Sequence, residues 1–189
     1  VPSLVISVSD DVQIGTNQDG SKQYRSVNLR FTGITATNKL IHITGADLLK
    51  ALSGFHPGQI TSISFIADPS INQTQGTVTV KTQGLVFIPQ IPANAQGTAT
   101  NLASYEVGVG EFDPNNVVTN FTQASSDQFS FGYNLANQTD LKLKWGGALM
   151  AFPDAHRPDL TTGEIVFEVS GVPSLVISVS DDVQIGTNQ

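Results

Sequence analysis

The first 18 residues of the chain occur a second time at its other end. Residues 1–18 and residues 172–189 both read VPSLVISVSDDVQIGTNQ, without a difference at any position. Nothing else in the 189 residues repeats at that period, which argues against a solenoid or a tandem array. The chain is therefore best divided into an N-terminal strand segment (1–18), a body (19–171) and a second copy of the segment (172–189).

The repeated segment alternates like a β-strand. One parity of its first copy carries Leu4, Ile6, Val8, Asp10, Val12 and Ile14, and five of these six side chains are apolar. Alternation of this length predicts a half-buried strand that inserts one face into an apolar groove. Asp10 is the exception on that face, and it predicts the exit of the groove, a β-bulge or a charge partner.

A strand that is present twice can complete a sheet that lacks one. A β-sandwich missing a strand exposes unpaired backbone groups and an apolar groove, and a strand from a neighbouring subunit can fill that groove by β-addition. In its layout, with an alternating N-terminal segment and the strand GEIVFEV directly before the second copy, the chain resembles donor-strand-complemented pilus and surface-filament subunits. The resemblance implies that the N-terminal segment of one subunit fills the groove of the next.

The residues expected to fill the groove are the apolar side chains of that one parity. In the first copy, the donor strand, they are Leu4, Ile6, Val8, Val12 and Ile14, and in the second copy they are Leu175, Ile177, Val179, Val183 and Ile185. The second copy would fill the groove of its own chain, or mark where the strand of a neighbour lies. A copy without functional meaning and a recent natural duplication are alternatives that the sequence leaves open.

The body predicts an antiparallel β-sandwich, of jelly-roll or immunoglobulin-like type, because short alternating segments recur with turn signals between them. The predicted strands span 24–31, 39–43, 59–67, 76–82, 84–91, 104–109, 117–122, 127–135, 141–145, 148–152 and 163–169. Gly146 and Gly147 predict a bulge or bend. The alternating aromatic residues Phe129, Phe131 and Tyr133 are expected in the core.

One short helix is predicted over 44–54. Thr44 is placed to cap its N-terminus, with Asp47 completing a variant of the capping box, and Gly54 is placed to end it. Leu48, Leu49 and Leu52 form the apolar stripe that would face the core.

Charge and composition argue against several partners. Only 13% of the residues are charged, the net charge is −7 and the pI is about 4.6. Binding nucleic acid or anionic lipid needs a basic surface, so we expect neither. The sequence contains no apolar run of 18 residues, so we expect no membrane insertion. The absence of Cys excludes disulfides and thiol catalysis.

No catalytic motif is present, so we expect that the protein is not an enzyme and has no cofactor. The loop PDAHRPDL carries Asp154, His156 and Asp159, which are weak candidates for a divalent metal site, and the simpler expectation is an ion pair of Arg157 with a carboxylate. The acidic pair Asp10-Asp11, copied at 181–182, is a weak candidate for Ca²⁺. We expect His42 to be a structural or surface residue and His56 to be solvated.

Three glycosylation sequons, at Asn72, Asn120 and Asn137, favour an extracellular or cell-surface protein. The sequence as a whole predicts a structural subunit of an extracellular filament or pilus, a homopolymer that assembles by donor-strand exchange. The alternatives are a jelly-roll virion coat protein and a secreted carbohydrate-binding β-sandwich module.

Overall fold

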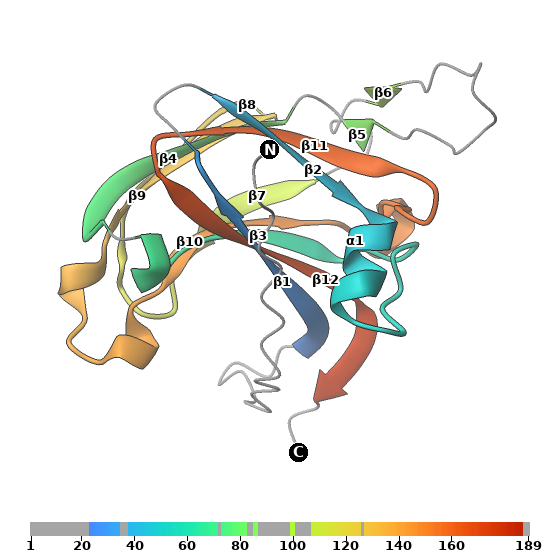
Figure 1. The fold of residues 1–189 in the computed structure, drawn as a ribbon, viewed down its shortest axis with the longest axis horizontal. Coiled ribbons are helices and arrows are strands. Elements are labelled where there is room, and N and C mark those ends of the chain that lie inside the picture. Colours follow the sequence, from blue (N-terminus) through green and yellow to red (C-terminus); the bar gives the residue numbers. More distant parts are fainter. Residues whose placement is uncertain are drawn as a thin grey trace.

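Figure 1 shows the computed structural model of the chain, which describes residues 23–34, 38–71, 73–82, 85–86, 99–100, 107–125 and 127–186. At Gln23, within the segment 184–186 and in the short strands near residues 85 and 100, only the backbone is described. The predicted donor residues Leu4, Ile6, Val8, Val12 and Ile14 and the sequon residue Asn72 lie outside the described residues.

Two five-stranded sheets face each other, and all hydrogen-bonded neighbours in them are antiparallel. The first sheet consists, in spatial order, of β1 (Gln23–Thr32), β12 (Ser174–Gly186), β3 (Ser62–Ala67), β10 (Gly146–Ala151) and β7 (Gly108–Phe112). The second consists of β2 (Lys39–Thr44), β11 (Glu164–Ser170), β4 (Gln75–Thr82), β9 (Gln128–Asn134) and β8 (Val118–Ser125). A short pair of strands, β5 (Leu85–Val86) and β6 (Ala99–Thr100), forms a separate two-stranded sheet, with β5 close to β11. The predicted all-β sandwich is confirmed.

The core lies between the two sheets and is built by the alternation of the strands. Phe65 of β3 packs edge-to-face against Phe129 of β9 at 5.4 Å and against Phe167 of β11 at 5.0 Å between ring centroids. Phe129, Phe131 and Tyr133 are all buried, as predicted. Because side chains of one parity point to one face of a strand, the odd-numbered residues of β9 fill the core while its even-numbered residues point away.

The helix α1 (Gly45–Ala51) begins as predicted. The backbone N–H of Asp47 donates to the Thr44 hydroxyl at 3.1 Å, and the backbone N–H of Thr44 donates to the Asp47 carboxylate at 3.0 Å, which completes the capping box. The helix ends at Ala51, before Gly54, whose φ of +84° places it in the turn that follows. Leu48 is buried, but Leu49 is exposed, so the predicted apolar stripe is wrong at that residue.

The predicted strand over 141–145 is wrong, because Leu141–Leu143 forms the 3₁₀ helix η4. Asp140 caps it, accepting a hydrogen bond from the backbone N–H of Lys142 at 2.9 Å. The alternating leucines do not enter the core, and Leu141 is 71% exposed. The other 3₁₀ helices among the described residues are η1 (Pro69–Ile71), η3 (Leu135–Asn137) and η5 (Asp154–His156).

Gly146 and Gly147 do not form the predicted bend. Both residues pair in regular register with β3, and Gly147 also pairs with Phe112 of β7, so they belong to β10. A Cβ on Gly147 would lie 1.8 Å from the backbone oxygen of Phe65. The glycine therefore permits a close approach of neighbouring strands rather than a change of chain direction.

Candidate functional site

The second copy of the repeat forms β12, an internal strand of the first sheet (Figure 1). On one side it pairs with β1, where Leu29 stands opposite Ile177, and on the other side with β3, where Phe65 stands opposite the same Ile177. We call the space between β1 and β3 the slot. Within the described strands, β1 has β12 as its sole hydrogen-bonded neighbour.

The core-facing side chains of β12 are those of the predicted parity. Leu175, Ile177 and Val179 are at most 1% exposed and belong to the hydrophobic core. Val183 is half-buried, and the side chain of Ile185 lies outside the described residues. The opposite face is also covered, since Val176 and Ser178 are buried, so this strand is more enclosed than a half-buried strand.

The chain enters the slot from the second sheet through residues 171–173. Gly171 has φ +96°, and a Cβ on it would lie 2.1 Å from the backbone oxygen of Thr77. After the turn, the backbone N–H of Ile34 donates to the carbonyl of Pro173 at 3.0 Å. This short crossing aligns the second copy with the slot directly after the end of β11.

The acidic residue on the inward face of the repeat, Asp181, is completely buried at the far end of the slot. Its carboxylate accepts hydrogen bonds from Arg25 Nε at 3.0 Å, from the backbone N–H of His56 at 2.7 Å and from the backbone N–H of Val183 at 3.0 Å. Arg25 also forms an ion pair with it through the guanidinium. A buried carboxylate is tolerated here because a cation and several N–H donors surround it.

The backbone bulges where this carboxylate is held. Ser26 stands opposite Ser180, whereas Tyr24 stands opposite Gln184, so residues 181–183 of β12 face the single residue Arg25 of β1. The pairing with β3 ends at Ser180, and the hydroxyl of Thr61 donates to the carbonyl of Asp181 at 3.0 Å. The copied acidic position thus coincides with a charge partner, a bulge and the end of the slot, the three features that its parity predicted for Asp10.

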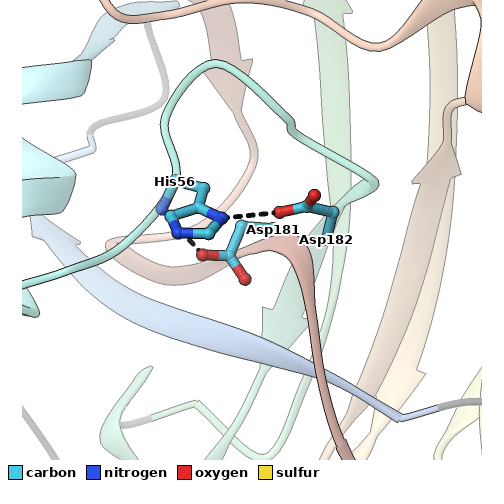
Figure 2. A group of neighbouring side chains, drawn as sticks. All are labelled: His56, Asp181 and Asp182. Carbon is cyan, nitrogen blue, oxygen red and sulfur yellow. Dashed lines mark hydrogen bonds and ion pairs between the residues drawn. The ribbon is translucent and has the colours of Figure 1, made fainter.

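Asp182, the next residue, faces the side chains of His56 and Arg157. His56 Nδ1 lies 2.8 Å from its carboxylate, and Figure 2 shows His56 joined by dashed lines to both acidic residues. Arg157 Nη1 lies 3.9 Å from Asp182, and Arg157 Nη2 lies 2.6 Å from Asp154. The predicted ion pair of Arg157 with a carboxylate is confirmed.

Among the described residues, one group of three potential metal ligands comes together, and it contains the acidic pair 181–182 rather than the candidates of the loop PDAHRPDL. Ligand atoms of His56, Asp181 and Asp182 lie within 4.8 Å of one another. Because Arg25 and Arg157 both contact these carboxylates, the arrangement is that of an ion-pair network. Calcium at this acidic pair stays a prediction.

The residues predicted as weak metal candidates do not converge. Asp154 binds Arg157, and Asp159 accepts a hydrogen bond from the backbone N–H of Thr161 at 2.8 Å. His156 is half-buried in η5. Sequence reasoning missed Arg25, although a signal was present: Arg25 shares the inward parity of Val27 and Leu29, and is thus a charged residue at a core-facing position, like the acidic residue of the repeat.

The described sequon residues are accessible. Asn120 lies exposed on β8, at the edge of the second sheet. Asn137 lies exposed in η3, where its Nδ2 donates to the carbonyl of Asn116 at 3.2 Å. His42 is also at the surface, as predicted, with Nδ1 3.1 Å from Glu164.

Comparisons of the chain with models of known protein families, with curated proteins and with solved structures each found no match. The helices of the described residues are too short or too polar to form a transmembrane span.

Proposed function

We propose that this chain is a structural subunit of an extracellular homopolymer, a filament or pilus, in which subunits are joined by donor-strand exchange. The N-terminal segment of one subunit fills the slot between β1 and β3 of the next. The observation that carries the proposal is the position of β12: a strand identical to the N-terminal segment is an internal strand of the sheet.

Removing β12 would leave a slot suited to a donor strand. β1 and β3 would both present unpaired backbone groups, and the core would lose Leu175, Ile177 and Val179. Burial of three such side chains stabilises by about 5–9 kcal/mol before the ordering of the strand is counted. An incomplete sheet with an apolar slot is the surface that β-addition recognises.

The ion pair at the end of the slot would define the register of the donor strand. A slip of two residues keeps apolar side chains pointing inward, but it moves the buried carboxylate away from Arg25 and the backbone N–H of His56. Leaving these charges without partners in the interior is strongly unfavourable. In the proposed polymer, Asp10 of the donor takes the place that Asp181 has in this structure.

The short linker between the donor strand and β1 would keep adjacent subunits close together. If Gly15 of the donor takes the place of Gly186, seven residues (16–22) join it to β1 of its own subunit. Seven residues span at most about 25 Å when fully extended. The exposed sequon residues Asn120 and Asn137 support an extracellular location.

The test mixes a donor with an acceptor that cannot donate. The full chain (1–189) has a filled slot and a spare N-terminal copy, while residues 19–171 have a slot and neither copy. We expect the two to form a complex of one donor and one acceptor, measured by size-exclusion chromatography with light scattering, after co-expression if the acceptor does not fold alone.

Ile6→Asp in the full chain should abolish this complex, because it places a charge on the inserted face. Ser9→Asp is the matched control, because its counterpart Ser180 points away from the core and is half-buried. Failure of the two proteins to associate, or association that survives Ile6→Asp, would overturn the proposed function.

A further inference from the structure

The register of β12 has a consequence for the other copy of the repeat in the same chain. β12 runs antiparallel to β1, and Gly186, at its end, stands opposite Gln23, at the start of β1. Gly15 is the counterpart of Gly186 in the first copy. A first copy placed in the slot with the same register would thus run antiparallel to β1 and end beside the residue at which β1 begins.

That arrangement is a β-hairpin within one chain. Residues 16–22, which read TNQDGSK, would form its loop. Opposed residues of antiparallel strands have Cα atoms about 5 Å apart, a gap that seven residues bridge easily. Asn, Asp-Gly and Ser are residues that turns favour.

The two copies would make the same contacts in the slot. Their sequences are identical, so Leu4, Ile6 and Val8 would replace Leu175, Ile177 and Val179, and Asp10 would meet Arg25. The occupants differ in the linker that holds them: residues 171–173 for the second copy and 16–22 for the first. The entropy cost of closing a loop rises slowly with its length, so the shorter linker favours occupation of the slot by the second copy by about fourfold.

We propose that the slot is a shared site for which two identical strands of one chain compete, residues 172–186 entering after β11 and residues 1–15 entering as a β-hairpin with β1. The inference rests on the proposed function, since the slot and the strand are the same. Whichever copy is outside the slot is a spare donor for a neighbour. One copy can therefore replace the other in the slot, and the sheet keeps a strand between β1 and β3.

Cysteine cross-links in the full chain test this competition, because the sequence contains no Cys. Ser26 stands opposite Ser180, and both belong to the parity that points away from the core. The counterpart of Ser180 in the first copy is Ser9. In the S9C/S26C/S180C variant, the thiol at position 26 on β1 can form a disulfide with position 9 of the first copy or with position 180 of the second copy. After equilibration in glutathione buffer, peptide mapping by mass spectrometry gives the ratio of the 9–26 disulfide to the 26–180 disulfide.

We expect both disulfides within monomers, with about one in five joining positions 9 and 26. Adding Ile177→Asp should make the 9–26 disulfide dominant, and adding Ile6→Asp instead should leave the 26–180 disulfide alone. Without the cysteines, each single Asp variant should melt close to the unmodified chain. The double variant I6D/I177D should melt more than about 10 °C lower, because no intact copy remains.

The outcomes separate this inference from the proposed function. If Ile177→Asp yields 9–26 disulfides only between chains, the hairpin is overturned and strand exchange between subunits stands. If Ile177→Asp lowers the melting temperature as far as the double variant and no 9–26 disulfide forms, competition within the chain is overturned. The proposed function is then decided separately, by the complex of the full chain with residues 19–171.

Discussion

At the scale of single residues, the most informative positions are two charges that occupy core-facing sites. The parity of Asp10 predicted a charge partner, and its copy Asp181 has one in Arg25. The partner itself could not be identified from the sequence, because β1 and β12 are separated by most of the chain and their register depends on every strand between them. Arg25 further contacts the ring of Phe55, with its guanidinium carbon 5.7 Å from the ring centroid.

We expect Arg25→Gln to lower the free energy of unfolding by about 3 kcal/mol, because it leaves Asp181 buried without its cation. This variant affects the slot whichever copy fills it. Arg30→Gln is the matched control on the same strand, since the pair of Arg30 with Asp68 is partly exposed at 3.6 Å and should contribute less than about 1 kcal/mol. Urea denaturation measures both, and equal losses would contradict a special role for Arg25.

Tyr133 makes stability depend on pH in the alkaline range. Burial raises the pKa of its phenol above the ordinary value of 10.0. The folded protein therefore keeps a proton that the unfolded chain releases, so stability is full below pH 10 and falls as the pH rises further.

Melting temperatures between pH 8 and pH 11 should consequently fall less steeply for Tyr133→Phe than for the unmodified chain above pH 10. Tyr24→Phe, at a half-buried tyrosine of β1, should keep the steep alkaline loss. Identical profiles for the Tyr133→Phe variant and the unmodified chain would show that this phenol does not cause the effect.

At the scale of elements, alternation predicted strands well where at least one partner strand is present in the sheet, and failed where no strand pairs with the segment. The segments 24–31, 76–82, 127–135 and 163–169 became β1, β4, β9 and β11 with small shifts at their ends. The segment 141–145 has the same alternation but folds as η4, because a local cap at Asp140 replaces sheet pairing. Alternation in the sequence indicates which side chains could share one face of a strand. It does not indicate whether a partner strand is available for backbone pairing.

The close approach of β3 and β10 gives a prediction at this scale. We expect Gly147→Ala to destabilise the fold by about 1–3 kcal/mol, because the added methyl group would overlap the backbone oxygen of Phe65 and push the strands apart. Gly110→Ala on the neighbouring strand β7 has no atom within 4 Å of the added group and should change stability by less than about 0.5 kcal/mol. Equal thermal stability of the two variants would contradict the tight packing at Gly147.

At the scale of the whole molecule, the sequence predicted the sandwich and the strand that is present twice, but not its place in the fold. Strand order is a long-range property: β12, the last strand of the sequence, lies between β1 and β3, which are among the first. This central position makes the repeat part of the structural framework, because without it β1 has no partner among the described strands. In the proposed competition, this same slot can be filled from either end of the chain.

We propose that either copy of the repeat can fill this slot. The most direct measurement compares residues 1–171, where the first copy is alone, with the same chain carrying Ile6→Asp, by light scattering and thermal unfolding. We expect residues 1–171 to form closed monomers or polymers. Ile6→Asp should abolish polymers and lower the melting temperature by more than about 10 °C, while Ser9→Asp should change neither. An unchanged molar mass and melting temperature in the Ile6→Asp chain would contradict the claim.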